Sequence, residues 1–133
     1  MPGSPSMSRE GSRPSELQKR LIRFAAKIVD VSVRLPRTRE GRHIGSQVLR
    51  SGTATAANYG EARGAESRSD FIHKLRIVLK ELNETAVWLE LIVECSLIPK
   101  EKLVGIVAEN QELCRIIAAS VRTARGGESG SQV

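Results

Sequence analysis

Apolar residues recur at alternating intervals of four and three positions along four separate stretches of this chain. The clearest stretch is residues 67–95, where one such row comprises Phe71, Leu75, Val78, Leu82, Thr85, Leu89 and Ile92. This spacing places the row along one side of an α-helix. A helix of this length gains most of its stability by burying such a stripe against neighbours. The pattern therefore predicts a helical bundle.

Three further segments carry comparable rows. Their members are Leu17, Leu21, Phe24, Ile28, Val31 and Leu35; then Ile44, Val48, Ser51, Thr55 and Tyr59; then Leu103, Ile106, Asn110, Leu113, Ile117, Ser120 and Ala124. The middle of the second row, residues 51–57, consists only of Ser, Gly, Thr and Ala. Side chains this small let a neighbouring helix backbone approach closely, although glycine and threonine lower helix propensity.

Helix start and stop signals separate the four segments. We expect Ser15 to cap the first helix after Pro14, Pro36 to end it, Gly64 to end the second, Ser67 or Ser69 to cap the third, and Pro99 to start the fourth. Short connections at residues 36–38, 64–67 and 96–98 make successive helices antiparallel neighbours. The prediction is all-α: an antiparallel up-down-up-down four-helix bundle over residues 15–125, with disordered tails at 1–14 and 126–133.

Composition narrows the class of protein further. The sequence has no run of about 18 apolar residues to cross a bilayer, and its first residues lack the apolar core of a secretory signal. A cytoplasmic protein is expected. In that compartment Cys95 and Cys114 are expected to be small buried residues, with a functional thiol pair as the alternative.

Positive charge is concentrated in one segment. The chain carries a net charge of +6. Residues 19–42 alone hold the same excess, because only Asp30 and Glu40 offset eight cations: Lys19, Arg20, Arg23, Lys27, Arg34, Arg37, Arg39 and Arg42. So local an excess is typical of a surface that binds a polyanion, and these eight residues are the candidate nucleic-acid contacts. The alternative is a solvated helix face that only favours solubility.

No group of residues indicates catalysis. Glu40 and His43 have the Glu-x-x-His spacing of carboxylate di-iron bundles, but such sites need two of these motifs and further glutamates. His43 and His73 lie near opposite ends of successive helices, and neither has a nucleophile at a suitable spacing. A non-enzymatic protein is predicted, with no catalytic residues, no metal site and no cofactor.

Polar residues on the inner faces of the second and third helices should face one another. A turn centred near residues 65–66 places Arg50 opposite Glu81, Gln47 opposite Glu84, and Asn58 or Glu61 opposite His73 and Lys74. A seam that fixes the helix register is expected, since buried charges need partners. A ligand pocket is the alternative.

The topology also brings many cations together at one end of the bundle. Helices one and three begin there, and helices two and four end there. The basic residues at this end are Lys19, Arg20, Arg23, Arg63, Arg68, Lys74, Arg76, Arg115, Arg122 and Arg125.

The middle of the chain resembles the family of 23S rRNA intervening sequence proteins over roughly residues 17–120. The resemblance rests on Gln47-Val-Leu-Arg50-Ser51, Ala57-Asn58-Tyr-Gly-Glu61-Ala62, Ser69-Asp70-Phe71-Ile72-x-Lys74-Leu75 and Lys80-Glu81-x-x-Glu84-Thr85-x-x-Trp88-Leu89. Thr55-Ala56 departs from the Ser-Ile that many members have there. The family is similar to the accessory variability proteins of diversity-generating retroelements, which bind nucleic acid and a reverse transcriptase. The resemblance implies a homopentamer of four-helix bundles.

Two functions remain open from the sequence. One is a basic homo-oligomer that binds RNA or DNA through phosphate contacts, without marked sequence preference. For this function the family resemblance implies a reverse transcriptase as a further partner. The other is a structural or protein-interaction module with no nucleic-acid role. A second apolar row on the third helix, comprising Ile72, Ile77, Leu79, Trp88 and Leu91, is expected to contribute to contacts between subunits.

Overall fold

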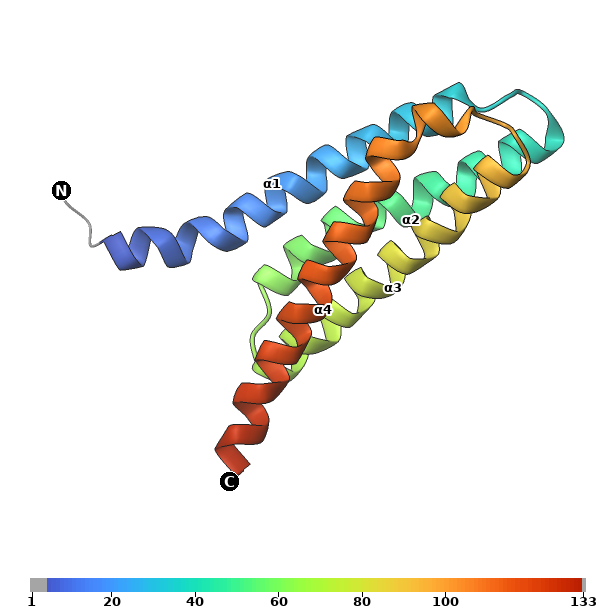
Figure 1. The fold of residues 1–133 in the computed structure, drawn as a ribbon. Coiled ribbons are helices and arrows are strands. Elements are labelled where there is room, and N and C mark those ends of the chain that lie inside the picture. The colour runs from blue at the N-terminus through green and yellow to red at the C-terminus, as the bar shows by residue number, and fades with distance from the viewer. Residues whose placement is uncertain (1–4, 133) are drawn as a thin grey trace.

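The four apolar rows fold as four α-helices, and the predicted all-α class is confirmed. The computed structural model describes the backbone of residues 5–132 and the side chains of residues 13–126. In chain order the elements are α1 (Pro5–Arg34), α2 (Arg39–Arg63), α3 (Arg68–Glu94), the short 3-10 helix η1 (Lys100–Lys102) and α4 (Val104–Gln132). Each helix lies beside the next one in the chain, and successive helices run in opposite directions (Figure 1).

Side-chain caps start two of the helices. Thr38 accepts a hydrogen bond from the backbone N–H of Gly41 at 3.1 Å, which satisfies a free donor in the first turn of α2. Ser67 accepts from the N–H of Asp70 at 3.0 Å and so caps α3. Of the two serines considered from the sequence, Ser67 is therefore the cap.

Two other boundaries differ from the prediction. Helix α1 passes through Pro14, so Ser15 lies within the helix and is not its N-cap. Helix α4 begins at Val104, because the residues after Pro99 form η1 first. The side chains of the expected tails, residues 1–14 and 126–133, fall almost entirely outside those that are described, and the tails stay a prediction.

The predicted rows form one continuous core. Each helix contributes fully buried apolar side chains, for example Phe24, Val48, Leu82 and Ile117. The polar members of the rows are paired within the core. The hydroxyl groups of Ser51 and Thr85 lie 2.8 Å apart across α2 and α3, and the Asn110 amide of α4 donates to the Leu82 carbonyl of α3 at 3.2 Å. These bonds offset the cost of burying polar groups.

Helix α1 packs very closely on the small residues of α2. A β-carbon added at Gly52 would lie 2.6 Å from Cγ2 of Ile28. At the turn that joins the two helices, a β-carbon at Gly41 would lie 2.0 Å from the carbonyl oxygen of Pro36. Neither position has room for a side chain, so the small residues permit the close approach expected from the sequence.

Helices α1 and α4 make far weaker contact than the other neighbouring pairs. They diverge toward the N-terminal part of α1 and the C-terminal part of α4 (Figure 1). The bundle is therefore open between these two helices at one end. Within residues 5–132, no helix is long and apolar enough to cross a membrane.

Candidate nucleic-acid interface

The eight candidate cations fall into two groups along α1 and the following turn. Lys19, Arg20, Arg23 and Lys27 belong to the part of α1 that faces the open end of the bundle. Arg34, Arg37, Arg39 and Arg42 surround the α1–α2 turn. Arg20 and Arg34 are 14 positions apart, which corresponds to about 21 Å of helix. The structure does not unite the eight residues in one patch.

The group at the α1–α2 turn lies on the surface. Arg34 pairs with Asp30 at 2.9 Å, and both side chains are more than half exposed. Arg42 donates to the carbonyl oxygen of Arg37 at 3.2 Å. Arg37 and Arg39 are exposed. These cations are accessible on the surface.

Three residues of the other group, Arg20, Arg23 and Lys27, line a shallow groove between α1 and α4, which we call the α1–α4 groove. It has a volume of about 530 Å³, and its lining consists of Arg20, Arg23, Lys27, Gly105, Ala108, Glu109, Glu112 and Arg115. Both acidic residues are already bound. Arg20 donates two hydrogen bonds to Glu109, at 2.7 and 2.8 Å, and Arg115 donates to Glu112 at 2.9 Å.

The electrostatics of this groove are dominated by its cations. The hydrogen bonds from Arg20 lower the pKa of the Glu109 carboxyl, and the nearby charges of Lys27 and Arg23 lower it further against the opposing effect of burial. The same bonds raise the pKa of Arg20. Because Arg20 and Arg115 satisfy the two glutamates, the exposed Arg23 and Lys27 remain available to an anion.

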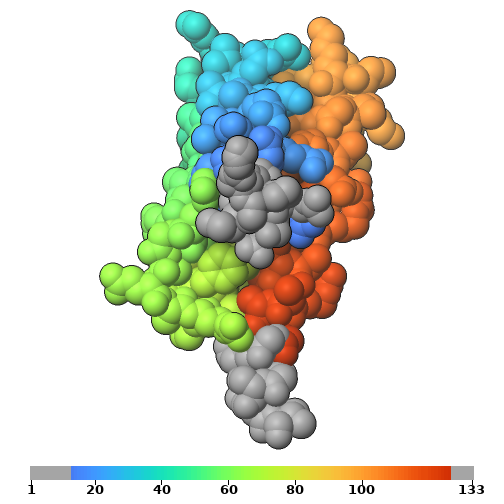
Figure 2. All heavy atoms as spheres, turned by 90° about the vertical axis from the view of Figure 1, so that its left-hand side faces the viewer, coloured from blue at the N-terminus to red at the C-terminus, as the bar shows by residue number. Residues whose placement is uncertain are grey.

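A larger hollow continues from this groove to the open end of the bundle. Its volume is about 1460 Å³, and five arginines line it: Arg13, Arg20, Arg23, Arg63 and Arg68. It lies where α1, the facing ends of α2 and α3, and the C-terminal part of α4 meet. Figure 2 views the molecule from this side, with α1 in blue, the α2–α3 ends in green and α4 in red. Leu17, Tyr59, Phe71 and Ile116 contribute apolar surface to it.

Three of these arginines were absent from the eight candidates. Arg63 and Arg68 are far from residues 19–42 in the sequence, but the bundle topology places them at the same end, as its helix directions alone could indicate. Arg13 lies within a segment that was expected to be a tail. The structure thus confirms that Arg63 and Arg68 lie with Arg20 and Arg23 at this end of the bundle, as expected from the topology, and it adds Arg13 to them.

Comparison with known proteins identifies the family. Residues 14–119 match the family described as 23S rRNA-intervening sequence protein. The chain belongs to this family. It is also similar to a solved protein of unknown function, described as from the S23 ribosomal protein family of Bacteroides thetaiotaomicron. The two share 35% identity with a TM-score of 0.77, over 82% of this chain and 97% of the other. Among curated proteins, no match is found.

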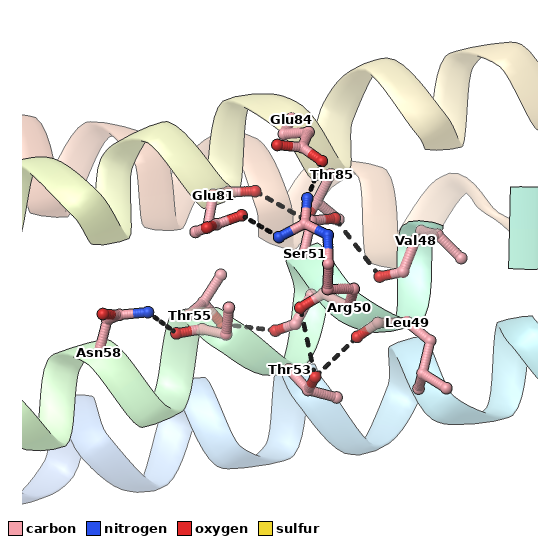
Figure 3. A network of polar contacts seen from close by, with 12 residues as sticks. Val48, Leu49, Arg50, Ser51, Thr53, Thr55, Asn58, Glu81, Glu84 and Thr85 are labelled. Carbon is pink, nitrogen blue, oxygen red and sulfur yellow. Dashed lines mark hydrogen bonds and ion pairs between the residues drawn. The ribbon is translucent and has the colours of Figure 1, made fainter. Parts of the chain in front are cut away.

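Several residues on which the family resemblance rests meet in space between α2 and α3. The guanidinium group of Arg50 pairs with Glu81 at 3.4 Å and with Glu84, as Figure 3 shows. The Trp88 indole also donates to Glu84, at 3.4 Å. Burial opposes ionisation of Glu84, but the hydrogen bonds from Arg50 and Trp88 outweigh it and lower the pKa of this carboxyl. These motif residues therefore join two helices.

The predicted seam is partly correct. The pairs of Arg50 with Glu81 and of Lys74 with Glu61, the latter at 2.8 Å, are confirmed. Arg50 was expected inside the bundle, but half of its side chain is exposed while that of Glu81 is 9% exposed. Its length lets it reach the carboxylates from the surface. Arg50 also pairs with Glu84, which was the partner expected for Gln47.

The two cysteines and His43 lie in different surroundings. Cys95 is exposed, contrary to the expected burial, because it is the first residue after α3. Burial raises the pKa of the Cys114 thiol, which donates to Asn83 at 3.5 Å. His43 packs edge-on against Trp88, with ring centroids 6.0 Å apart. Among the described side chains, no three potential ligands are gathered around a metal position.

The asymmetric burial of the Arg50 network gives a stability prediction. Truncation of Arg50 to alanine leaves two carboxylates near each other without their cation, and Glu81 is buried. We expect a loss of about 1–2 kcal/mol in the free energy of unfolding, measured by urea denaturation. Arg34→Ala, which breaks the exposed pair with Asp30, is the matched control and should cost no more than about 0.5 kcal/mol. Equal losses for the two variants would contradict a role of Arg50 in joining α2 to α3.

Proposed function

We propose that this protein is a non-enzymatic, oligomeric bundle that binds nucleic acid through phosphate contacts. The observation that carries the proposal is the arrangement of cations along the α1–α4 groove. Arg23 and Lys27 line this groove, and Lys19 extends their row by one turn outside it. The three side chains are exposed at intervals of four residues, or about 6 Å, on one side of α1. A row of this kind suits the repeating phosphates of a nucleic-acid backbone.

The environment of the row supports an anionic ligand. The two glutamates of the groove are held by Arg20 and Arg115, so they do not neutralise Arg23 and Lys27. The name of the family and that of the solved relative refer to rRNA and to a ribosomal protein family, respectively. These names are compatible with RNA as the ligand. A reverse transcriptase as a further partner, and a relation to accessory variability proteins, stay predictions.

Charge-reversal variants test whether nucleic acid binds at the α1–α4 groove or at the α1–α2 turn. We expect binding of both RNA and DNA at 50 mM salt, weakening about a hundredfold at 200 mM when several subunits contribute contacts. The double variant R23E/K27E should reduce the affinity at least about tenfold and lower the salt slope by roughly 1.4–1.8. Fluorescence anisotropy with labelled oligonucleotides measures both quantities.

The matched control is R37E/R39E, which changes the net charge equally at the other end of α1 and should have a much smaller effect. Circular dichroism checks that both variants retain their helices. The proposal fails if the wild-type protein binds neither RNA nor DNA at 50 mM salt. A loss of binding in R37E/R39E alone would place the contacts at the turn.

The oligomeric part of the proposal is supported by an exposed apolar row on α1. Its members are Ile22, Ala26, Val29 and Val33, and the Val33 side chain is 76% exposed. The residues of the second apolar row on α3 instead mostly pack within the chain itself. Ile72 is buried, Leu79 and Trp88 pack against the core, and Leu91 is 36% exposed. We therefore place the contact between subunits on α1.

Light scattering tests this assembly. The wild-type protein should form a homo-oligomer, and the family resemblance favours a pentamer. V29Q/V33Q should shift the population toward a single species of 14.6 kDa, because it removes apolar surface from the proposed contact. V87Q, at an exposed valine of α3, should leave the assembly unchanged. A wild-type protein that is monomeric at micromolar concentration would contradict the proposal.

A further inference from the structure

The hollow between α1 and α4 combines two properties that phosphate binding alone does not require. Its rim is strongly cationic, and Glu16 is the one acidic residue among the described residues that line it. Its floor is apolar. Leu17, Phe71 and Ile116 are half-buried there, and Tyr59 also lines it with 5% of its surface exposed. An occupant should therefore present both negative charge and apolar side chains.

Most arginines of the rim form no ion pair with another described side chain. Glu109 holds Arg20, and no ion pair is present for Arg13, Arg23, Arg63 or Arg68 among the described side chains. These four residues come from α1, α2 and α3, so they surround the hollow instead of lying along one helix. Their charges are complementary to carboxylates placed on both edges of a bound segment.

The size and shape of the hollow favour a helix. Its volume of about 1460 Å³ exceeds the roughly 300–1000 Å³ typical of small-molecule pockets. It lies between two diverging helices (Figure 1), and several of its lining residues are alanines, which let another helix come close: Ala62, Ala65, Ala119 and Ala124. A nucleic-acid backbone offers no apolar surface to this floor, and its one half-exposed aromatic residue, Phe71, is a poor platform for stacking several bases.

We propose that the hollow is a docking site for an acidic amphipathic helix of a partner protein. The apolar face of that helix contacts Leu17, Phe71 and Ile116, and its flanking Glu or Asp residues pair with Arg63 and Arg68 on one side and with Arg13 and Arg23 on the other. This is recognition of a helix in a groove, with charges that set its orientation. It overlaps the proposed nucleic-acid row at Arg23 alone, since Lys19 and Lys27 do not line the hollow.

A designed peptide of about 18 residues, long enough to form a helix on binding, is the probe. It carries Leu at i, i+3, i+4 and i+7 and Glu on the flanking positions, with a fluorescent label. A scrambled peptide of the same composition is the matched control, because it keeps the charge and loses the apolar face. Fluorescence anisotropy with the full-length protein should show at least tenfold tighter binding of the amphipathic peptide.

Variants locate the bound peptide. R63E/R68E and, separately, I116D should each weaken peptide binding at least tenfold, while R37E/R39E should change it less than about threefold. Because I116D lies outside the cation row, it should leave oligonucleotide binding within about threefold of the wild type. The docking site and the proposed nucleic-acid function can thus fail independently.

Three results would overturn the inference. Equal binding of the scrambled peptide would show that the hollow binds anionic peptides through charge alone and does not recognise an amphipathic helix. Loss of oligonucleotide binding in I116D, with no peptide binding by the wild type, would make nucleic acid the occupant. Self-association that disappears in both R63E/R68E and I116D, again without peptide binding, would make a second copy of this chain the occupant.

Discussion

The close contact between α1 and α2 governs the shape of this bundle. At Gly52 the backbone of α2 leaves no room for a β-carbon, because Ile28 of α1 occupies that space. Helix α1 is therefore held along α2. On the opposite side of the bundle, Asn110 of α4 bonds to Leu82 of α3, so α4 is held along α3. Little remains to hold α1 against α4.

The consequences for function follow from that weak contact. The bidentate pair of Arg20 with Glu109 joins α1 to α4 where they are still close. Beyond this pair the helices diverge, and apolar side chains that a tighter bundle would bury, such as Ile116, line an open hollow. Arginines from the α1 side and from the α2–α3 ends border the opening. One geometric feature thus produces both the cationic groove and the apolar surface beside it.

The periodicity of the sequence was sufficient to predict the helices, their order and much of the core. The α2–α3 register was also predictable, because a short turn fixes which residues face each other; the Arg50–Glu81 pair follows from it. The position of the Arg50 side chain was not predictable, since a long side chain can reach a buried carboxylate from the surface. The second apolar row on α1, which includes Ile22 and Val33, has the same period as the core row beside it. Burial is what distinguishes the two.

The divergence of α1 and α4 could not be predicted from the sequence. A heptad-like apolar row indicates which side of a helix is buried. It does not indicate how far along the helix a neighbouring helix stays in contact. For that reason the topology could place Arg63 and Arg68 at this end of the bundle, but the hollow that they border emerged only from the structure. The charge excess of residues 19–42 pointed to α1, but not to the part of α1 that lines a cavity.

Thiol labelling of two adjacent residues tests the open bundle end most directly. In a background with Cys95 and Cys114 replaced by serine, the variants to compare are Ile116→Cys and Ile117→Cys. Ile116 lines the hollow, whereas Ile117 is fully buried in the core. The structure predicts that a cysteine at 116 is labelled at a rate near that of the exposed Cys95 in a separate control variant, Cys114→Ser, which keeps Cys95. Labelling at 116 should be at least tens of times faster than at 117, where reaction requires local unfolding. Equal protection at both positions would show that α1 and α4 close against each other in solution and that the hollow does not exist there.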